Sequence, residues 1–289
     1  MFCNNCIHKC NVNRKTSLGK CRCSSATYVN KIMLHKWEEP CLSNTVGAGA
    51  VFFCGCNLNC VFCQNYKLHD AKNGTLYTEE QLSDLFLQLQ DNGADNIDLV
   101  TPTPHIHTIK NALKLSKKNG LRIPVVYNTS GSDTVESIHS MDGLIDIYLP
   151  DFKYVSSELS KQFSGCFNYY PNILDVLLEM YHQTGTLSID KNGLATHGIL
   201  IRHMILPCCV QDSFHVLESI HDILPSETYI SLLRQYTPTE QVKSIKHLNR
   251  RITTREYDRV VQHALDLGFY NIFLQEKESA EKEYIPGFK

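Results

Sequence analysis

The stretch Cys56-Asn57-Leu58-Asn59-Cys60-Val61-Phe62-Cys63 places three cysteines within eight residues, separated by three and then two residues. Thiolates are soft ligands that suit iron–sulfur clusters, zinc or copper. A four-iron cluster has four irons and this loop supplies three thiolates, so one iron is left free for a small molecule. Structural zinc needs four closed ligands, and the next cysteine downstream is Cys166. The loop therefore favours a catalytic cluster over half of a zinc site or a chance grouping of buried cysteines.

The chain around this loop alternates short apolar runs with longer amphipathic ones. Strands are predicted at 50–54, 97–100, 123–127, 144–149, 199–206, 229–233 and, more briefly, 272–274. Helices are predicted at 78–92, 106–119, 133–140, 173–183, 210–223 and 253–267, the first opened by the capping-box pair Thr78 and Gln81. This alternation is typical of parallel strands joined by right-handed crossovers. We expect an α/β fold, a partial (β/α) barrel of about six parallel strands.

Residues 1–45 differ from the barrel domain predicted at 46–289, because they are polar, rich in cysteine and poor in hydrophobic periodicity. A segment this small buries little core, and a bound metal is a natural way to order it. Cys3, Cys6, Cys10 and Cys21 are four candidate thiolate ligands. Zinc and a second iron–sulfur cluster both fit their spacing.

Composition limits the class of protein. The 289 residues carry a net charge of -2 at a pI of about 6.7, which gives no electrostatic case for nucleic-acid or acidic-membrane binding. No run of 18 apolar residues and no signal-peptide pattern occurs, so we expect a soluble cytoplasmic protein. Clustered cysteines in a reducing compartment indicate metal or redox chemistry. The five single cysteines are expected to be small buried hydrophobes: Cys41, Cys54, Cys166, Cys208 and Cys209.

Polar residues follow most of the predicted strands. They include Thr101 to His105, Asn128 to Gly131, Asp151 to Lys153, Arg202 with His203, and Arg234 to Tyr236. Chemistry collects at the carboxyl ends of strands in barrels, although any single strand end can be polar simply because loops contact water. We expect these ends to meet at one site, and we assign neither His105 nor His203 as a ligand or base.

The cysteine loop, extended to Gly55 and Tyr66, resembles that of the radical S-adenosylmethionine enzymes, in a branch related to the pyruvate formate-lyase activating enzyme. Further stretches carry the same resemblance across nearly the whole chain: His35-x-Trp37-Glu38-Glu39-Pro40, Leu99 to Pro104, Tyr127 to Gly131, Tyr148 to Tyr154, Ile201-Arg202-His203 with Leu206-Pro207, Gln235-Tyr236, and the N-terminal cysteines. The stretch Thr101 to Thr103 departs from the Gly-Gly-Glu segment that activating enzymes usually have there.

The resemblance implies roles for individual residues. Cys56, Cys60 and Cys63 would bind a [4Fe-4S] cluster, whose open iron chelates S-adenosyl-L-methionine. Residues implied to contact that cofactor are Phe62 beside the adenine, Thr101 and Thr103 near the amino group, Asn128, Thr129 and Asp151 around the ribose, carboxylate or a monovalent cation, and Lys153 and Arg202 as cations for the carboxylate or the substrate. The alternative for the last two is an ordinary ion pair.

The implied activity is reductive cleavage of S-adenosylmethionine to a 5′-deoxyadenosyl radical that abstracts hydrogen from a substrate. Flavodoxin or ferredoxin would donate the electron. The substrate would be a glycine in a partner glycyl-radical enzyme, another peptide, or a small molecule. The competing hypothesis is a non-catalytic iron–sulfur or zinc protein that serves as an electron carrier or scaffold. It predicts a closed cluster with four protein ligands.

Overall fold

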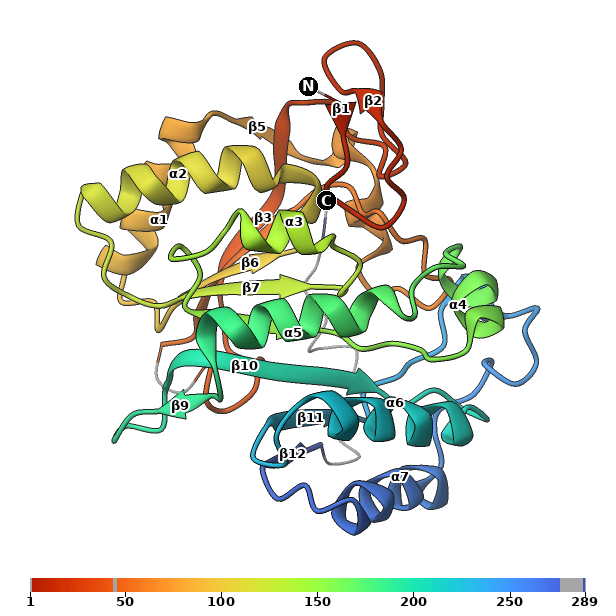
Figure 1. The fold of residues 1–289 in the computed structure, drawn as a ribbon. Helices are drawn as coiled ribbons and strands as arrows, with labels where there is room; N and C mark the ends of the chain where they lie inside the picture. The colour runs from red at the N-terminus through yellow and green to blue at the C-terminus, as the bar shows by residue number, and fades with distance from the viewer. Residues whose placement is uncertain (1, 44–45, 276–287, 289) are drawn as a thin grey trace.

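The computed structural model describes residues 2–43, 46–275 and 288, and most of these build one sheet covered by helices (Figure 1). The strands lie in the order β12 (Ile272–Leu274), β11 (Tyr229–Leu233), β10 (Ala195–Met204), β8 (Ile147–Pro150), β7 (Val125–Thr129), β6 (Ile97–Val100), β4 (Ala48–Phe53), β3 (Thr27–His35) and β5 (Thr75–Tyr77). The short strand β9 (Ser188–Ile189) pairs with β10. A separate two-stranded sheet joins β1 (Phe2–Cys3) to β2 (Val12–Asn13).

From β4 to β12 every neighbouring pair of strands is parallel, which confirms the predicted α/β fold with a mostly parallel sheet. The connections carry the helices α1 (Glu79–Asp91), α2 (Ile106–Lys118), α3 (Val135–His139), α4 (Ser157–Ser164), α5 (Asn172–Thr184), α6 (Val210–Ile223) and α7 (Thr254–Asp266). Single 3-10 turns occur at η1 (Tyr66–His69), η2 (Ala71–Asn73), η3 (Thr103–His105) and η4 (Glu240–Val242). The capping box of Thr78 and Gln81 begins α1, as predicted. Within the described ranges, no helix is long and apolar enough to cross a membrane.

The sequence did not predict five strands (β1, β2, β3, β5 and β9) or one helix (α4), of which β3 and α4 matter most for the site. Strand β3 lies within the cysteine-rich stretch and pairs antiparallel with both β4 and β5. Asn30 and Lys31 interrupt its apolar pattern, so hydrophobic periodicity alone does not predict this strand. Helix α4 has only two large apolar residues, Leu159 and Phe163, among its eight. Both elements are stabilised by what they pack against rather than by a strong local pattern.

The parallel strands are apolar on both faces, but the faces serve different purposes. On the outer face Val51, Phe53 and Leu99 pack with the helices in the main core. On the inner face Phe52 and Val100 belong to a separate, small apolar cluster. Because side chains alternate along a strand, one sequence supplies both the core and the lining of the inner face.

The N-terminal segment is held against the carboxyl edge of the sheet. The buried guanidinium of Arg14 donates to the backbone oxygen of Pro104, just after β6. Ile7 N donates to Ser132 O at 3.0 Å, just after β7. Figure 1 shows β1 and β2 at this end of the sheet. The cysteine-rich segment therefore forms part of the rim around the strand ends.

Glycine at position 198 permits strand β10 to pass close to the chain that precedes β9. Its φ is +119°, and a Cβ would lie 2.3 Å from Leu187 Cα. We expect Gly198→Ala to lower the free energy of unfolding by about 3 kcal/mol or more, because strain and backbone overlap add. Gly120→Ala is the matched control, since φ is +103° but nothing lies within 4 Å of the added carbon. The Gly120→Ala variant should lose only about 1–2 kcal/mol in the free energy of unfolding. Equal losses in urea denaturation would show that the close approach to Leu187 is unimportant.

Candidate active site

A cavity of about 620 Å³ on the inner face of the sheet collects residues from the strand ends. It is lined by Cys56, Cys60, Cys63, Phe62, Thr101, Asn128, Thr129, Asp151, Lys153 and Arg202. Thr103 lies outside this lining: it is buried, with Oγ1 3.3 Å from Thr129 Oγ1. The structure thus brings the residues singled out in the sequence to one place, with Thr103 behind its wall.

The cysteine loop follows β4 directly and is fixed by backbone hydrogen bonds to α4. Val61 N donates to Phe163 O at 2.8 Å, and Asn59 N donates to Ser164 O at 3.1 Å. These carbonyls belong to the last turn of a helix, where they have no partner within the helix. The loop N–H groups satisfy them, so an irregular loop acquires a defined position.

The three thiols of the loop influence one another. Burial raises the pKa of Cys56 to about 12, and the Cys60 charge adds to the rise. Burial also raises the pKa of Cys63, with contributions from both Cys60 and Cys56. The ammonium group of Lys153 acts in the opposite direction on all three. The sulfurs therefore lie near one another beside one cation.

This thiol set fits a multi-iron cluster better than a single ion. Over the described residues, no group of three or more His, Cys, Asp or Glu side chains is arranged to hold one metal ion. A cluster presents a separate iron to each thiolate, and its ligands therefore stand farther apart than those around one zinc. Three thiols that would repel one another as thiolates are compatible with a cluster whose irons neutralise that charge.

A buried polar network follows β7 and supports the loop from the side. Asp133 is fully buried and accepts hydrogen bonds from Tyr127 Oη at 2.9 Å and Thr129 Oγ1 at 2.5 Å. Asn57 Nδ2, from the cysteine loop, donates to Ser132 Oγ at 2.7 Å. Thr129 thus has its hydroxyl proton committed to Asp133, which orients its side chain at the cavity wall.

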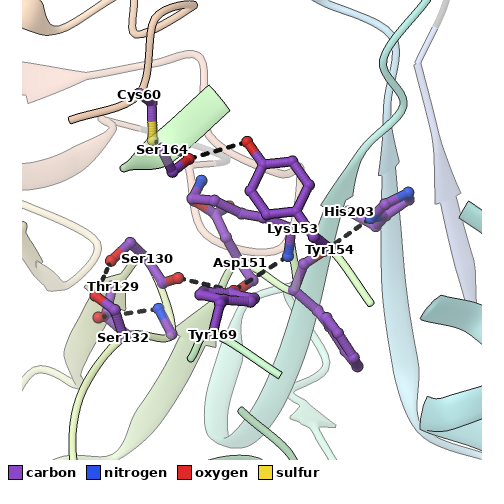
Figure 2. A network of polar contacts seen from close by, with 12 residues as sticks. Cys60, Thr129, Ser130, Ser132, Asp151, Lys153, Tyr154, Ser164, Tyr169 and His203 are labelled. Atoms are coloured by element: carbon purple, nitrogen blue, oxygen red, sulfur yellow. Dashed lines mark hydrogen bonds and ion pairs between the residues drawn. The ribbon is translucent and has the colours of Figure 1, made fainter. Parts of the chain in front are cut away.

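The end of β8 supplies a paired charge. Lys153 Nζ lies 2.6 Å from Asp151 Oδ2. Burial would lower the pKa of Lys153, but the Asp151 and Cys60 charges outweigh it, and the pKa is raised. Tyr169 Oη donates to the carbonyls of Asp151 and Ser130, and Figure 2 shows it between the two strand ends. Lys153 is therefore a permanently charged group facing the thiols.

Another part of the cavity is lined by ion pairs that the sequence did not predict as a unit. Arg202 Nε donates to Glu39 Oε1 at 2.8 Å, and Nη2 contacts the carboxylates of both Glu38 and Glu39. Burial and then the Glu38 charge raise the pKa of nearby Asp98 well above its usual range. Its Oδ1 has no hydrogen-bond partner among the described residues. Arg202 thus lines the cavity as part of an ion-pair network.

Both strand-end histidines are buried and hydrogen-bonded. His203 Nδ1 is 2.7 Å from Phe152 O, and its Nε2 is 2.9 Å from Ser213 Oγ. His105 Nε2 is 2.6 Å from Cys54 O. Burial lowers the pKa of each histidine to about 4. They are neutral packing residues at neutral pH.

The N-terminal cysteines lie beside the cysteine loop. A Cβ at Gly19 would be 3.2 Å from Cys21 Sγ and 3.8 Å from Cys10 Sγ, so glycine keeps the space between these two sulfurs open. The charge of Cys21 also acts on the thiols of Cys6 and Cys56. The N-terminal cysteines and the loop cysteines, which the sequence assigned to two separate metal sites, are therefore neighbours in the fold.

Among the single cysteines, Cys41, Cys54 and Cys166 are buried, as expected. The expectation is wrong for Cys208, which is exposed, and for Cys209, which is only half-buried. Cys208 follows the end of β10 with φ +63°, and its Sγ accepts a hydrogen bond from Arg250 Nη2 at 3.0 Å. The chain turns outward here and leaves the side chain in solvent.

The sequence predicted no role for two residues beside the cysteine loop. Ser164 Oγ lies 2.9 Å from Cys60 Sγ, and Tyr154 Oη lies 2.9 Å from Ser164 Oγ. Tyr154 was quoted only as part of a longer stretch, and Ser164 sits at the end of the unpredicted helix α4. A motif-based search finds neither, because neither is a ligand type at a ligand spacing.

Comparison with known proteins gives a consistent family. The radical S-adenosylmethionine superfamily matches residues 50–177. The chain is 30% identical over 275 residues to the uncharacterised protein MJ0674 of Methanocaldococcus jannaschii, with 91% of this chain and 74% of that protein covered.

Similar solved structures concern the fold alone. Streptococcus suis SuiB, bound to its precursor peptide SuiA, has a TM-score of 0.52 at 11% identity, over 76% of this chain and 46% of SuiB. This chain therefore spans about half the length of SuiB. A domain of the pyruvate-formate lyase-activating enzyme from Bacteroides vulgatus has a TM-score of 0.46 at 14% identity, over 63% of this chain and 100% of that domain.

The ion pairs between Arg202 and the two glutamates lead to a stability prediction. Arg202→Met leaves Glu38 and Glu39 buried without their guanidinium, and we expect a loss of about 3–5 kcal/mol in the free energy of unfolding. Arg234→Met is the control: this arginine lies over the Tyr257 ring at 4.9 Å near the end of the adjacent strand. Its loss should stay near or below about 1 kcal/mol. Urea denaturation measures both, and equal losses would contradict a structural dependence on Arg202.

Proposed function

This chain belongs to the radical S-adenosylmethionine superfamily and is a radical S-adenosylmethionine enzyme, and from that premise we propose that Cys56, Cys60 and Cys63 hold its [4Fe-4S] cluster. The observation that carries the proposal is the convergence of these thiols on one cavity with the strand ends. When bound, the cluster supplies the electron that cleaves S-adenosylmethionine to methionine and a 5′-deoxyadenosyl radical, which abstracts hydrogen from the substrate.

The chain's own residues bind and orient the cofactor. Asn128, Thr129 and Thr101 offer polar groups from neighbouring strand ends. Lys153 supplies a positive charge beside the thiols, and this charge suits the carboxylate of an amino-acid moiety. Thr103 acts indirectly, through its contact with the Thr129 hydroxyl.

Three further lining residues have more restricted roles. Phe62 packs at 6.5 Å from the Tyr154 ring and 6.2 Å from the Tyr236 ring, so its side chain is a fixed apolar wall for the adenine. Arg202 is engaged by Glu38 and Glu39, and we assign it to shaping the substrate end of the cavity. Asp151 holds Lys153 in place.

Electron delivery and substrate are the outer parts of the proposal. A flavodoxin or ferredoxin donates the electron. The hydrogen comes from a glycine of a partner glycyl-radical enzyme, from another peptide or from a small molecule. SuiB with its bound precursor peptide gives one protein of similar fold that holds a peptide, and this supports testing peptides first.

Anaerobic reconstitution tests the cluster assignment. We expect the wild-type protein to contain four irons and four sulfides at this site and to form 5′-deoxyadenosine from S-adenosylmethionine after reduction. A triple variant, Cys56→Ala, Cys60→Ala, Cys63→Ala, should lose this cluster. It should form 5′-deoxyadenosine only at the background level. The control is Cys166→Ala, which alters a buried cysteine outside the loop. This variant should retain both the cluster and the formation of 5′-deoxyadenosine. A loaded cluster that fails to bind S-adenosylmethionine would instead favour an electron carrier or scaffold.

We also propose that the cysteine-rich segment, residues 1–45, binds a second metal through Cys3, Cys6, Cys10 and Cys21. The open space that Gly19 keeps beside Cys10 and Cys21 supports this. Among the described residues these four cysteines are not grouped as ligands of one metal ion, so the proposal requires the segment to rearrange when metal binds. Replacing the four cysteines by serine should remove the iron or zinc present beyond the first cluster, without loss of that cluster's signal. Elemental analysis of zinc, iron and sulfide measures the change, with Cys41→Ala as the control. An unchanged metal content would reject this second site.

A further inference from the structure

A buried hydroxyl contacts one of the three loop sulfurs. Ser164 Oγ is 2.9 Å from Cys60 Sγ, and both side chains are buried, with Ser164 1% exposed. All three sulfurs have a backbone hydrogen bond, but for Cys56 and Cys63 the bonds from Leu58 and Asn65 come without a side-chain donor. Cys60 is thus the sulfur whose environment includes a side chain that can be altered by mutation.

A second hydroxyl extends this contact into the core. Tyr154 Oη is 2.9 Å from Ser164 Oγ, and Figure 2 shows the three groups in a row. The Tyr154 ring is held edge-on between Phe62 at 6.5 Å and Tyr169 at 6.0 Å, with Phe163 at 6.3 Å. The phenol therefore cannot turn away from Ser164 without disturbing three aromatic neighbours.

We propose that Tyr154 and Ser164 form a hydrogen-bond chain that raises the reduction potential of the cluster through the Cys60 sulfur. The inference rests on the proposed function, because it requires Cys60 to be a cluster ligand. Ligation fixes the direction of the chain: a ligating thiolate has no proton, so Ser164 donates to Cys60. The Ser164 oxygen is then free to accept the hydrogen bond from Tyr154.

The physical effect follows from where the electron goes. Reduction adds negative charge to the cluster and its thiolate ligands, and a hydrogen bond donated to a sulfur stabilises that charge. Tyr154 polarises the Ser164 hydroxyl and strengthens its donation. Tyr154 and Ser164 are therefore positioning residues that act through Cys60, and they make the cluster easier to reduce by an external donor.

The geometry allows the hydroxyl to be removed without dismantling the loop. Asn59 and Val61 are bonded to the backbone carbonyls of Ser164 and Phe163, not to side chains. Ser164→Ala keeps both carbonyls and the helix end. A suitable control lies one turn earlier in α4: the Ser160 hydroxyl is equally buried and donates to Cys166 O rather than to a loop cysteine.

The test is a redox titration of the reconstituted protein, followed by electron paramagnetic resonance of the reduced cluster. We expect Ser164→Ala to shift the midpoint potential to a more negative value, and Tyr154→Phe to shift it less in the same direction. Ser160→Ala should match the wild type. Iron and sulfide content, measured on each variant, must equal that of the wild type for the comparison.

The outcomes separate this inference from the cluster assignment. Wild-type potentials in both Ser164→Ala and Tyr154→Phe, or an equal shift in Ser160→Ala, would overturn the hydrogen-bond chain and leave the cluster assignment intact. A cluster that persists in the Cys56, Cys60, Cys63 triple variant after Cys3, Cys6, Cys10 and Cys21 have also been replaced by serine would overturn the assignment itself. If Ser164→Ala fails to load iron, Tyr154→Phe alone decides, because it leaves Ser164 and Cys60 untouched.

Discussion

The hydrogen bonds between the last turn of α4 and the cysteine loop are the constraint on which the site depends. A helix end leaves carbonyls without partners, and an irregular loop leaves N–H groups without partners. Here Val61 and Asn59 satisfy the carbonyls of Phe163 and Ser164. Gly165, with φ +65°, ends the helix just after these contacts. Three cysteines on a loop without regular structure thereby gain a fixed arrangement beside the sheet.

Charge compensation divides the cavity into two parts. Near the thiols, Lys153 is held by Asp151 and remains available to anionic groups in the cavity. At the other end, Arg202 is engaged by Glu38 and Glu39. Buried charges are tolerated when they are paired and hydrogen-bonded. A cation at a strand end thus faces the cavity beside the thiols at Lys153, where we propose that it binds ligand, and pairs with buried carboxylates at Arg202.

Some features of the site were accessible from local sequence and others were not. Thr78 and Gln81 predict where α1 begins, because a capping box is a contact between residues only three positions apart. The polar strand ends could be placed together because parallel strands share an edge. The sequence could not decide whether Arg202 contacts the cofactor or forms an ion pair, since its partners lie 163 and 164 residues away along the chain. Ser164 could not be found at all, because its importance comes from Cys60, 104 residues distant.

The sequence by itself determined the alternation of strands and helices, the cysteine loop and the family resemblance, because each is a pattern of neighbouring residues with a local physical cause. Tertiary structure alone decided that β3 joins the sheet, that Glu38 and Glu39 engage Arg202, and that Tyr154 and Ser164 approach Cys60. Those contacts join segments whose separate patterns are weak or ambiguous. Their partners become defined only when packing brings the segments together, since burial is what makes an unpaired charge or hydroxyl costly.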